Sequence, residues 1–177
     1  MNKYWNALIY IAATLGANYT AAWFFPLWIF GQAAVGTLIF GVTFTQRDRL
    51  HSAGRRWVYG TIMVAAVSNV AMSIALGVPF RIILASFLAI IIAEAVDTEV
   101  YQALINRSWL TRVASSNAVS IPLDTVLFTM VAFAGELSTP EILALLVGDT
   151  IVKYIIGIVV ALGRDSRGSS LNSSSTE

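Results

Sequence analysis

RIILASFLAIIIAEAVDTEVYQALIN, residues 81–106, is the stretch that decides the fold. After Arg81, the residues from Ile82 to Ala93 carry no charge. At about 1.5 Å per residue, a helix from Arg81 to Ile105 is roughly 36 Å long, which exceeds the roughly 30 Å of a bilayer's hydrocarbon core. The stretch therefore predicts a helix that spans a membrane.

Two acids interrupt this apolar stretch. Glu94 falls near the middle of the span, and Asp97 and Tyr101 follow at spacings of three and four, which places all three residues on one helical face. A carboxylate at the centre of a bilayer costs at least about 2.5 to 3.5 kcal/mol on insertion scales. Packing a hydrophobic bundle does not require that cost, so we expect this face to line a polar binding site that the other helices surround.

The composition favours a membrane protein. Of the 177 residues, 57% are hydrophobic and 12% are charged, whereas soluble domains carry about 25% charged residues. The chain has no Cys, which excludes a disulfide framework and thiol chemistry. The net charge of +1 comes without a basic tract, so we expect no nucleic-acid partner.

The hydropathy pattern predicts an all-α membrane protein in which six transmembrane helices form one bundle over residues 1–163. The expected spans are 5–25, 27–45, 57–76, 81–105, 113–134 and 142–162. Residues 164–177 are polar and rich in Ser and predict a disordered cytoplasmic tail. With the N-terminus inside, nine of the 11 Lys and Arg residues fall on the cytoplasmic side, so both termini are expected in the cytoplasm.

Small residues mark the first two spans. Ala13, Ala17 and Ala21 form a stripe that permits another helix to approach closely, either as a packing seam or as a docking surface. Glycines at 31, 36 and 41 interrupt the second span and indicate either close packing or a broken helix. The basic segment 46–56 predicts a loop, and its His51, which is the only His of the chain, is expected to be solvated.

Polar residues also recur in the other spans. Asn117, Ser120 and Asp124 share one face of the fifth span, and Asn69 lies in the third. In the sixth span Asp149 precedes Lys153 by four residues, the favourable order for an ion pair within a helix, and both a structural and a functional role stay open. Acids outnumber the single lysine in the spans, which suits a neutral or cationic solute rich in N–H groups.

Catalytic motifs do not emerge from the sequence. A Gly-x-Ser-x-Gly site with a membrane His is missing, and so is the His-Glu-x-x-His pattern of metalloproteases. The Gly-x-x-x-x-Gly-Lys-Ser/Thr pattern of ATP hydrolysis is missing as well. We therefore expect a protein that binds and passes a solute, without an enzymatic activity, a metal or a cofactor.

The motifs GANYTAAW (16–23) and AVGTLIFGVTFTQRDRLH (34–51), followed by VPFRIILASFLAIIIAEAVDTEVY (78–101) and SSNAVSIPLDTVLF (115–128), resemble one family as an ordered set. The chain resembles the VUT, or YhhQ-like, membrane proteins. The resemblance implies a queuosine precursor transporter of the bacterial inner membrane. Its solutes would be 7-deazaguanines such as preQ0 and preQ1, or queuine, which serve tRNA modification.

The chemistry of a deazaguanine suggests roles for the polar residues. A carboxylate can accept from the ring N–H and the exocyclic amine together, an Asn can serve the carbonyl edge, and an aromatic ring can cover the ring face. The candidate substrate-binding residues are Glu94, Asp97, Asn117, Ser120, Asp124, Asn69, Tyr101 and Phe128. A stand-alone secondary transporter and a substrate-binding, S-component-like subunit of an ATP-driven vitamin importer both fit, and a homodimer is left open.

Overall fold

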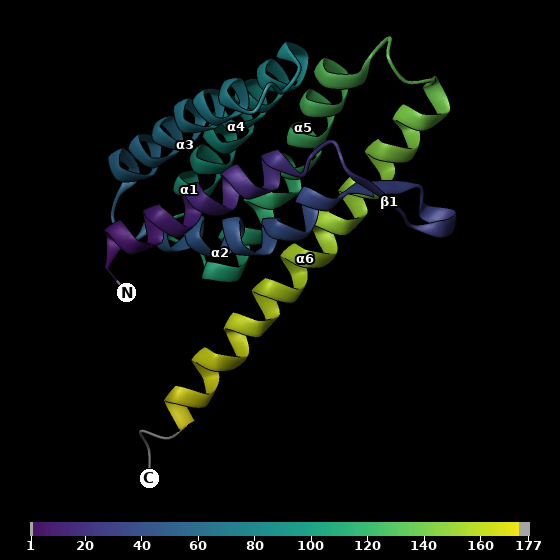
Figure 1. Cartoon of the computed structure of the whole chain (residues 1–177). Helices are drawn as coiled ribbons and strands as arrows, with labels where there is room; N and C mark the ends of the chain where they lie inside the picture. Colours follow the sequence, from purple (N-terminus) through teal and green to yellow (C-terminus); the bar gives the residue numbers. More distant parts are fainter. Residues whose placement is uncertain (1, 174–177) are drawn as a thin grey trace.

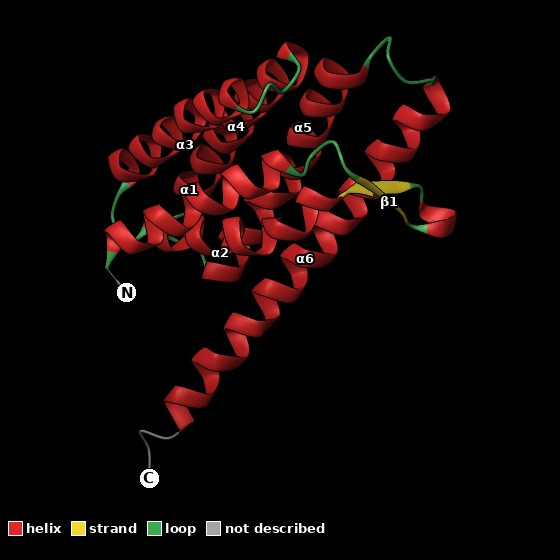
Figure 2. Cartoon of the chain, viewed as in Figure 1, coloured by secondary structure: helices red, strands yellow, loops and turns green. Residues whose placement is uncertain are grey.

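The computed structural model describes residues 2–173, with side chains through residue 163, and it is almost entirely helical (Figure 2). Its short elements are the strands β1 (Phe24–Pro26) and β2 (Gln32–Ala34) and the 3-10 helices η1 (Trp28–Phe30) and η2 (Val35–Ile39). Its α-helices are α1 (Lys3–Tyr19), α2 (Phe40–His51), α3 (Arg55–Ala75), α4 (Phe80–Ala103), α5 (Trp109–Phe133) and α6 (Thr139–Ser173).

Three of these helices are long and apolar enough to cross a membrane, namely α3, α5 and the part of α6 over Thr139–Gly163. α4 is 24 residues long, which at about 1.5 Å per residue also exceeds a bilayer's hydrocarbon core. It differs from the other three by the acids Glu94, Asp97 and Glu99 in its second half. The predominantly helical fold is as predicted, whereas the predicted tail over 164–177 falls mainly on residues whose side chains are not described and stays a prediction.

The predicted second span, residues 27–45, is not a continuous helix, which agrees with the broken-helix interpretation of its glycines. Phe24–Pro26 pairs with Gln32–Ala34 in an antiparallel hairpin, and α-helix begins only at Phe40. Gly31 has a φ of 95°, which L side chains rarely adopt, so the turn of the hairpin depends on it. The backbone N–H of Ala34 donates to the Asp149 carboxylate of α6 at 2.8 Å, so part of the backbone bonding is made with a neighbouring helix.

Close backbone approaches fix the hairpin between α1 and α6. A Cβ added to Gly36 would lie 2.0 Å from the carbonyl oxygen of Ala17, and one added to Gly148 would lie 2.1 Å from that of Gln32. The glycines therefore permit contacts that no larger residue allows. The Ala17 position of the predicted alanine stripe is a packing seam within the molecule.

The predicted loop 46–56 is wrong over its first half, because α2 continues to His51. Arg47 and His51 are only 2% and 6% exposed. The His51 ring is stacked on Tyr101 with 3.9 Å between ring centroids, and its Nδ1 lies 3.1 Å from Gln102 Nε2. The expectation of a solvated His is therefore also wrong, since α4 supplies the partners that water would otherwise provide.

The turns that connect the long helices lie at two opposite ends of the bundle. Figure 1 shows α3 and α4 side by side and α1 beside α2, and α6, the longest helix, packs against α2 and α5. The turns 76–79 and 134–138 lie together at one end, joined by an Arg81–Glu136 ion pair of 2.9 Å, and we name this the α3–α4 end. The turns 52–54 and 104–108 mark the opposite, α2–α3 end, where Arg55 pairs with Glu99 at 2.6 Å.

Candidate functional site

A polar cavity lies between α1, the β2–η2 segment, α2, α4, α5 and α6. It encloses about 670 Å³ of unoccupied space, its open mouth included. Its ionisable lining residues come from four helices: Tyr10, Glu94, Asp124, Asp149 and Lys153. Further polar groups are contributed by Thr14, Asn18, Thr37, Thr43 and Ser86, and aromatic rings by Phe40 and Phe128.

Glu94 and Asp124 face this one cavity from α4 and α5, and Phe128 lies one turn beyond Asp124. Three residues that the sequence analysis selected are therefore brought to a shared hollow. The Glu94 and Asp124 side chains are 15% and 19% exposed, so both carboxylates are largely withdrawn from solvent while still bordering open space.

Lys153 is paired with α5. Its Nζ lies 2.6 Å from Asp124 Oδ2 and donates to Thr125 Oγ1 at 3.0 Å, and it sits 4.5 Å from the centre of the Phe40 ring. Asp149 instead accepts from the Ala34 N–H at 2.8 Å and from the Thr37 hydroxyl at 2.9 Å. The Asp149–Lys153 ion pair expected within α6 is therefore wrong, because each residue has a closer partner on another segment.

A second cluster of charges forms around Arg47 of α2. Its Nη1 lies 3.2 Å from Glu94 Oε1, its Nε lies 3.0 Å from Asp97 Oδ2, and its Nη2 donates to Asn117 Oδ1 at 2.8 Å. Ser120 donates to the other Asp97 oxygen at 2.9 Å. Asp97, Asn117 and Ser120 thus meet as the spacing predicted, but around an arginine, with Asp97 wholly buried.

The Arg47 cluster adjoins the cavity. A smaller hollow lined by Arg47, Ser120 and Ile121 also includes Glu94 and Asp124, which both belong to the main cavity. Glu94 therefore belongs both to the Arg47 cluster and to the main cavity: its carboxylate contacts Arg47, and the residue also lines the cavity. Among the residues whose side chains are described, the structure shows no group of three His, Cys, Asp or Glu side chains that could hold a metal.

Arg47 is the main residue that sequence reasoning missed. Its position in the polar and basic segment 46–56 predicts a loop. Phe40, Phe44 and Arg47 recur at spacings of four and three, which is the periodicity of one helical face. Together with the surplus of acids in the neighbouring helices, this periodicity was the available signal for a buried cation.

The remaining candidates lie around the cavity or away from it. The Asn18 side chain lines the cavity, where it accepts from Ser86, and it donates to Asn69 behind it. Asn69 is wholly buried and so supports Asn18 without bordering the open space. Tyr101 lies outside the cavity. Its ring is stacked on the His51 ring, and the guanidinium carbon of Arg112 lies 5.0 Å from its centre.

Two cations, Arg47 and Lys153, share this region with five carboxylates: Asp48, Glu94, Asp97, Asp124 and Asp149. The negative surplus favours a ligand that brings N–H groups or a positive charge, because unpaired acids in a low-dielectric interior are costly. A mostly apolar helical bundle that encloses such a cavity is typical of a membrane protein that binds a small solute.

The comparison with family models agrees with this class. The model described as "Putative vitamin uptake transporter" matches residues 34–162, and the chain belongs to that family. No curated protein and no solved structure matches the chain. The protein is therefore a membrane transporter of the vitamin uptake family, and the matched range contains α2 to α5, α6 as far as residue 162 and most of the cavity lining.

Proposed function

We propose that this protein imports a queuosine precursor, a 7-deazaguanine such as preQ0 or preQ1 or the base queuine, through the cavity between Glu94 and Asp124. The observation that carries the proposal is that these two carboxylates, which come from different helices, border the same hollow. A deazaguanine offers a ring N–H and an exocyclic amine on one edge, which a carboxylate accepts together.

The other lining groups complement the rest of such a ring. Asn18 and Ser86 offer an amide and a hydroxyl toward the cavity, and Phe128 and Phe40 offer apolar ring faces. An aromatic ring packed against a flat heterocycle contributes about 0.5 to 1.5 kcal/mol beyond burial. The proposed arrangement therefore places polar recognition on the edge of the solute and apolar contact on its face.

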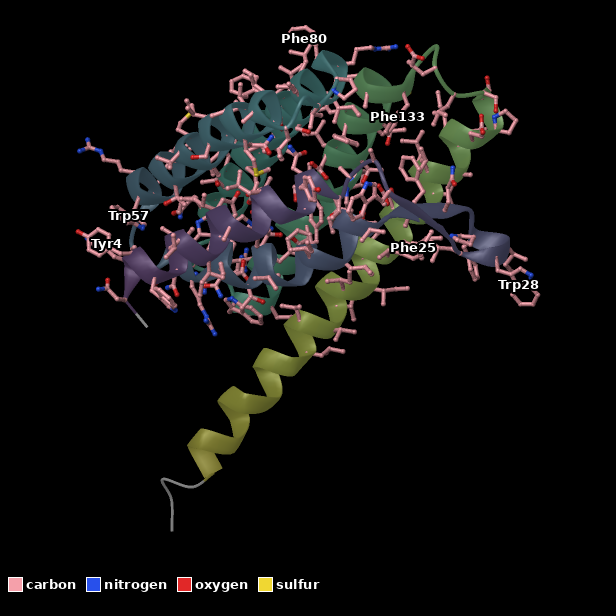
Figure 3. The ribbon with its side chains drawn as sticks, in the orientation of Figure 1. Tyr4, Phe25, Trp28, Trp57, Phe80 and Phe133 are labelled. Atoms are coloured by element: carbon pink, nitrogen blue, oxygen red, sulfur yellow. The ribbon has the colours of Figure 1, made fainter. Side chains whose placement is uncertain are left out.

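In this proposal the bundle crosses the bacterial inner membrane six times, with both termini in the cytoplasm. The second half of the hairpin, η2 and α2 as far as Thr45 together make the second crossing, residues 27–45. Support comes from rings near the two ends, where Tyr4 and Trp57 lie together at the α2–α3 end and Phe80 and Phe133 lie toward the other (Figure 3). Aromatic side chains are enriched at the two interfaces of a membrane.

Uptake of labelled preQ1 tests the proposal in cells that lack their own queuosine precursor transporter. Cells that express this protein should accumulate label above cells that carry the empty vector, and excess unlabelled queuine should reduce the accumulation. Excess biotin should leave it unchanged. Accumulation no greater than in the vector control would contradict the proposed substrate.

The alternative of a binding subunit for an ATP-driven importer depended on the alanine stripe of α1 as a docking surface. Ala17 of that stripe is already packed against Gly36 of the same chain, which favours the stand-alone transporter. Purified protein in liposomes separates the two mechanisms. Transport of preQ1 by the protein alone is expected, and binding without transport would favour the subunit.

A further inference from the structure

The cavity occupies only one half of the molecule. On α4 its lining residues run from Ser86 to Glu94 and stop there, and on α5 they run from Asp124 to Phe128. Both segments lie on the side of the α3–α4 end, as do Ala21 and Ala34 at the base of the hairpin. The segments of α4 and α5 nearer the α2–α3 end contribute no lining residue.

The Arg47 cluster lies where the cavity stops. Beyond it, toward the α2–α3 end, α2 and α4 present buried side chains: Leu50 is 1% exposed and Thr98 is wholly buried. The stacked rings of His51 and Tyr101 continue this layer. A separate groove between α5 and α6, lined by Val113, Asn117 and Ile121, shares none of the residues that line the main cavity. A solute in the cavity therefore has an open side and a closed side, and the closed side begins at Arg47.

One guanidinium connects the three helices of the closed side. Arg47 belongs to α2, its carboxylate partners Glu94 and Asp97 to α4, and its amide partner Asn117 to α5. The ring of Phe44 lies 5.0 Å from the guanidinium carbon. Because a guanidinium presents five N–H donors in a fixed fork, it can hold all these partners together, whereas an ammonium cannot reproduce that geometry.

The cavity and the closed side share Glu94. A solute N–H that binds the Glu94 carboxylate competes with Arg47 for the same oxygens, since those oxygens lie 3.2 and 3.3 Å from Nη1. Occupation of the cavity therefore weakens one of the two carboxylate contacts that fix Arg47. This provides a physical link between binding on the open side and loosening of the closed side.

We propose that Arg47 is the positioning residue that closes the cavity toward the α2–α3 end, and that a solute passes only when its ion pairs with Glu94 and Asp97 separate. The proposal rests on the proposed function for its solute, but the closure itself is a property of the protein without solute. In the six-span orientation proposed above, the closed side faces the cytoplasm.

Cysteine labelling tests the closure directly, because the chain has no native Cys. Asn18→Cys reports on the cavity, which the partly exposed Asn18 lines, and Thr98→Cys reports on the buried layer beyond Arg47, where Thr98 is wholly buried and does not line the cavity. Both substitutions nearly conserve volume. A small water-soluble maleimide applied to purified protein should label the cysteine at 18 and leave the cysteine at 98 unmodified.

Arg47→Lys should increase the labelling rate of the cysteine at 98 at least tenfold and leave that at 18 unchanged, because a lysine cannot hold both carboxylates and Asn117. Arg55→Gln, which breaks the exposed ion pair with Glu99, is the matched control and should leave both rates unchanged. In wild-type background, preQ1 should raise labelling at 98. Equal labelling at 98 in wild type and Arg47→Lys would overturn the closure.

If Arg47→Lys does not fold, a second variant tests the closure. Arg47→Gln combined with Glu94→Gln and Asp97→Asn removes the whole ionic cluster without leaving a buried charge unpaired, and it too should expose the cysteine at 98. Protection at 98 in that variant would contradict the proposal. If preQ1 changes no labelling rate while Arg47→Lys still increases labelling of the cysteine at 98, the result supports the closure and contradicts the proposed substrate.

Discussion

The positive charge of Lys153 is buried, so it needs the carboxylate of Asp124 for compensation, whereas water can solvate an exposed lysine. Its side chain is 4% exposed, and its ammonium contacts Asp124 of α5 at 2.6 Å. Removing one member of a buried ion pair leaves the other charge without compensation, which costs far more than the pair itself contributes. The stability of the α5–α6 packing is therefore tied to a residue that also borders the cavity.

Asp124→Asn should destabilise the protein by about 3 kcal/mol, because Lys153 then remains charged without a carboxylate. Denaturant-induced unfolding in detergent micelles measures the change. The double variant Asp124→Asn with Lys153→Met removes the orphaned charge, and it should recover more than half of the loss. A double variant that is no more stable than the single one would contradict this reading of the pair.

His51 is a buried imidazole beyond the proposed second span. Burial, and after it the positive charges of Arg47 and Arg112, together lower its pKa to about 3. The unfolded chain binds a proton at His51 below its ordinary pKa of about 6.5, whereas the folded protein does not. The stabilisation that neutral His51 gives is thus complete above pH 6.5 and is lost as the pH falls from 6.5 toward 3.

Stability should therefore fall with acidification in a way that depends on His51. Well below pH 6.5 the contribution of this residue approaches about 1.4 kcal/mol per pH unit. His51→Phe keeps a ring against Tyr101 but cannot be protonated, so its free energy of unfolding should vary less between pH 7 and pH 5. Parallel pH profiles for the two proteins would show that His51 does not titrate as described.

At the scale of elements, the least predictable part of the site is the segment between α1 and α2, which consists of the β1–β2 hairpin and η2. Its base supplies Ala34, Gly36 and Thr37 to the cavity wall, and Asp149 of α6 holds two of them through hydrogen bonds. Its tip projects away from the helices and ends at Trp28, which is 91% exposed (Figure 3). The position of the cavity wall therefore depends on how closely the hairpin approaches α6.

Gly148→Ala should displace the hairpin, since the added Cβ would lie 2.1 Å from the Gln32 carbonyl oxygen. We expect a loss of at least 2 to 3 kcal/mol in stability, on the order of other overpacked positions, and weaker preQ1 binding. Gly60→Ala of α3 is the control, because a Cβ there meets nothing within 4 Å. Thermal unfolding of both variants checks the difference, and equal stability would refute the close approach.

Periodicity predicted the long elements and part of the site. Glu94 and Asp124 could be selected because a charge inside an apolar run is costly, and Asn117 and Ser120 because they share a face with Asp124. The hairpin could not be predicted in the same way, since its hydrogen bond to Asp149 joins residues 115 positions apart. Arg47 was missed because hydropathy assigns a charged segment to water, although here two acids of α4 neutralise it.

The whole molecule carries most of its basic residues toward one end. Arg47 is buried and does not contribute to this asymmetry. Arg49, Arg55, Arg56 and Arg107 still lie near the α2–α3 end, so the asymmetry remains. The α3–α4 end presents Arg81 already paired with Glu136. Basic residues near the ends of spans are retained on the cytoplasmic side.

A reporter fused to the C-terminus should therefore be read from the cytoplasm. A fluorescent protein that matures only in the cytoplasm is expected to fluoresce, and an alkaline phosphatase fused at the same position should stay inactive. The same pair fused after Gly77, with α4 to α6 removed, should give the opposite result. Active phosphatase at the C-terminus would require an odd number of spans or the inverse orientation.

The central claim is that Glu94 and Asp124 bind one solute together, and titration of the purified protein with preQ1 tests it most directly. Each hydrogen bond to a charged group contributes about 1.5 to 3 kcal/mol, so Glu94→Gln and Asp124→Asn should each raise the Kd at least tenfold, while Arg55→Gln should leave it unchanged. Wild-type affinity for preQ1 in both cavity variants, each shown to be folded, would contradict the claim.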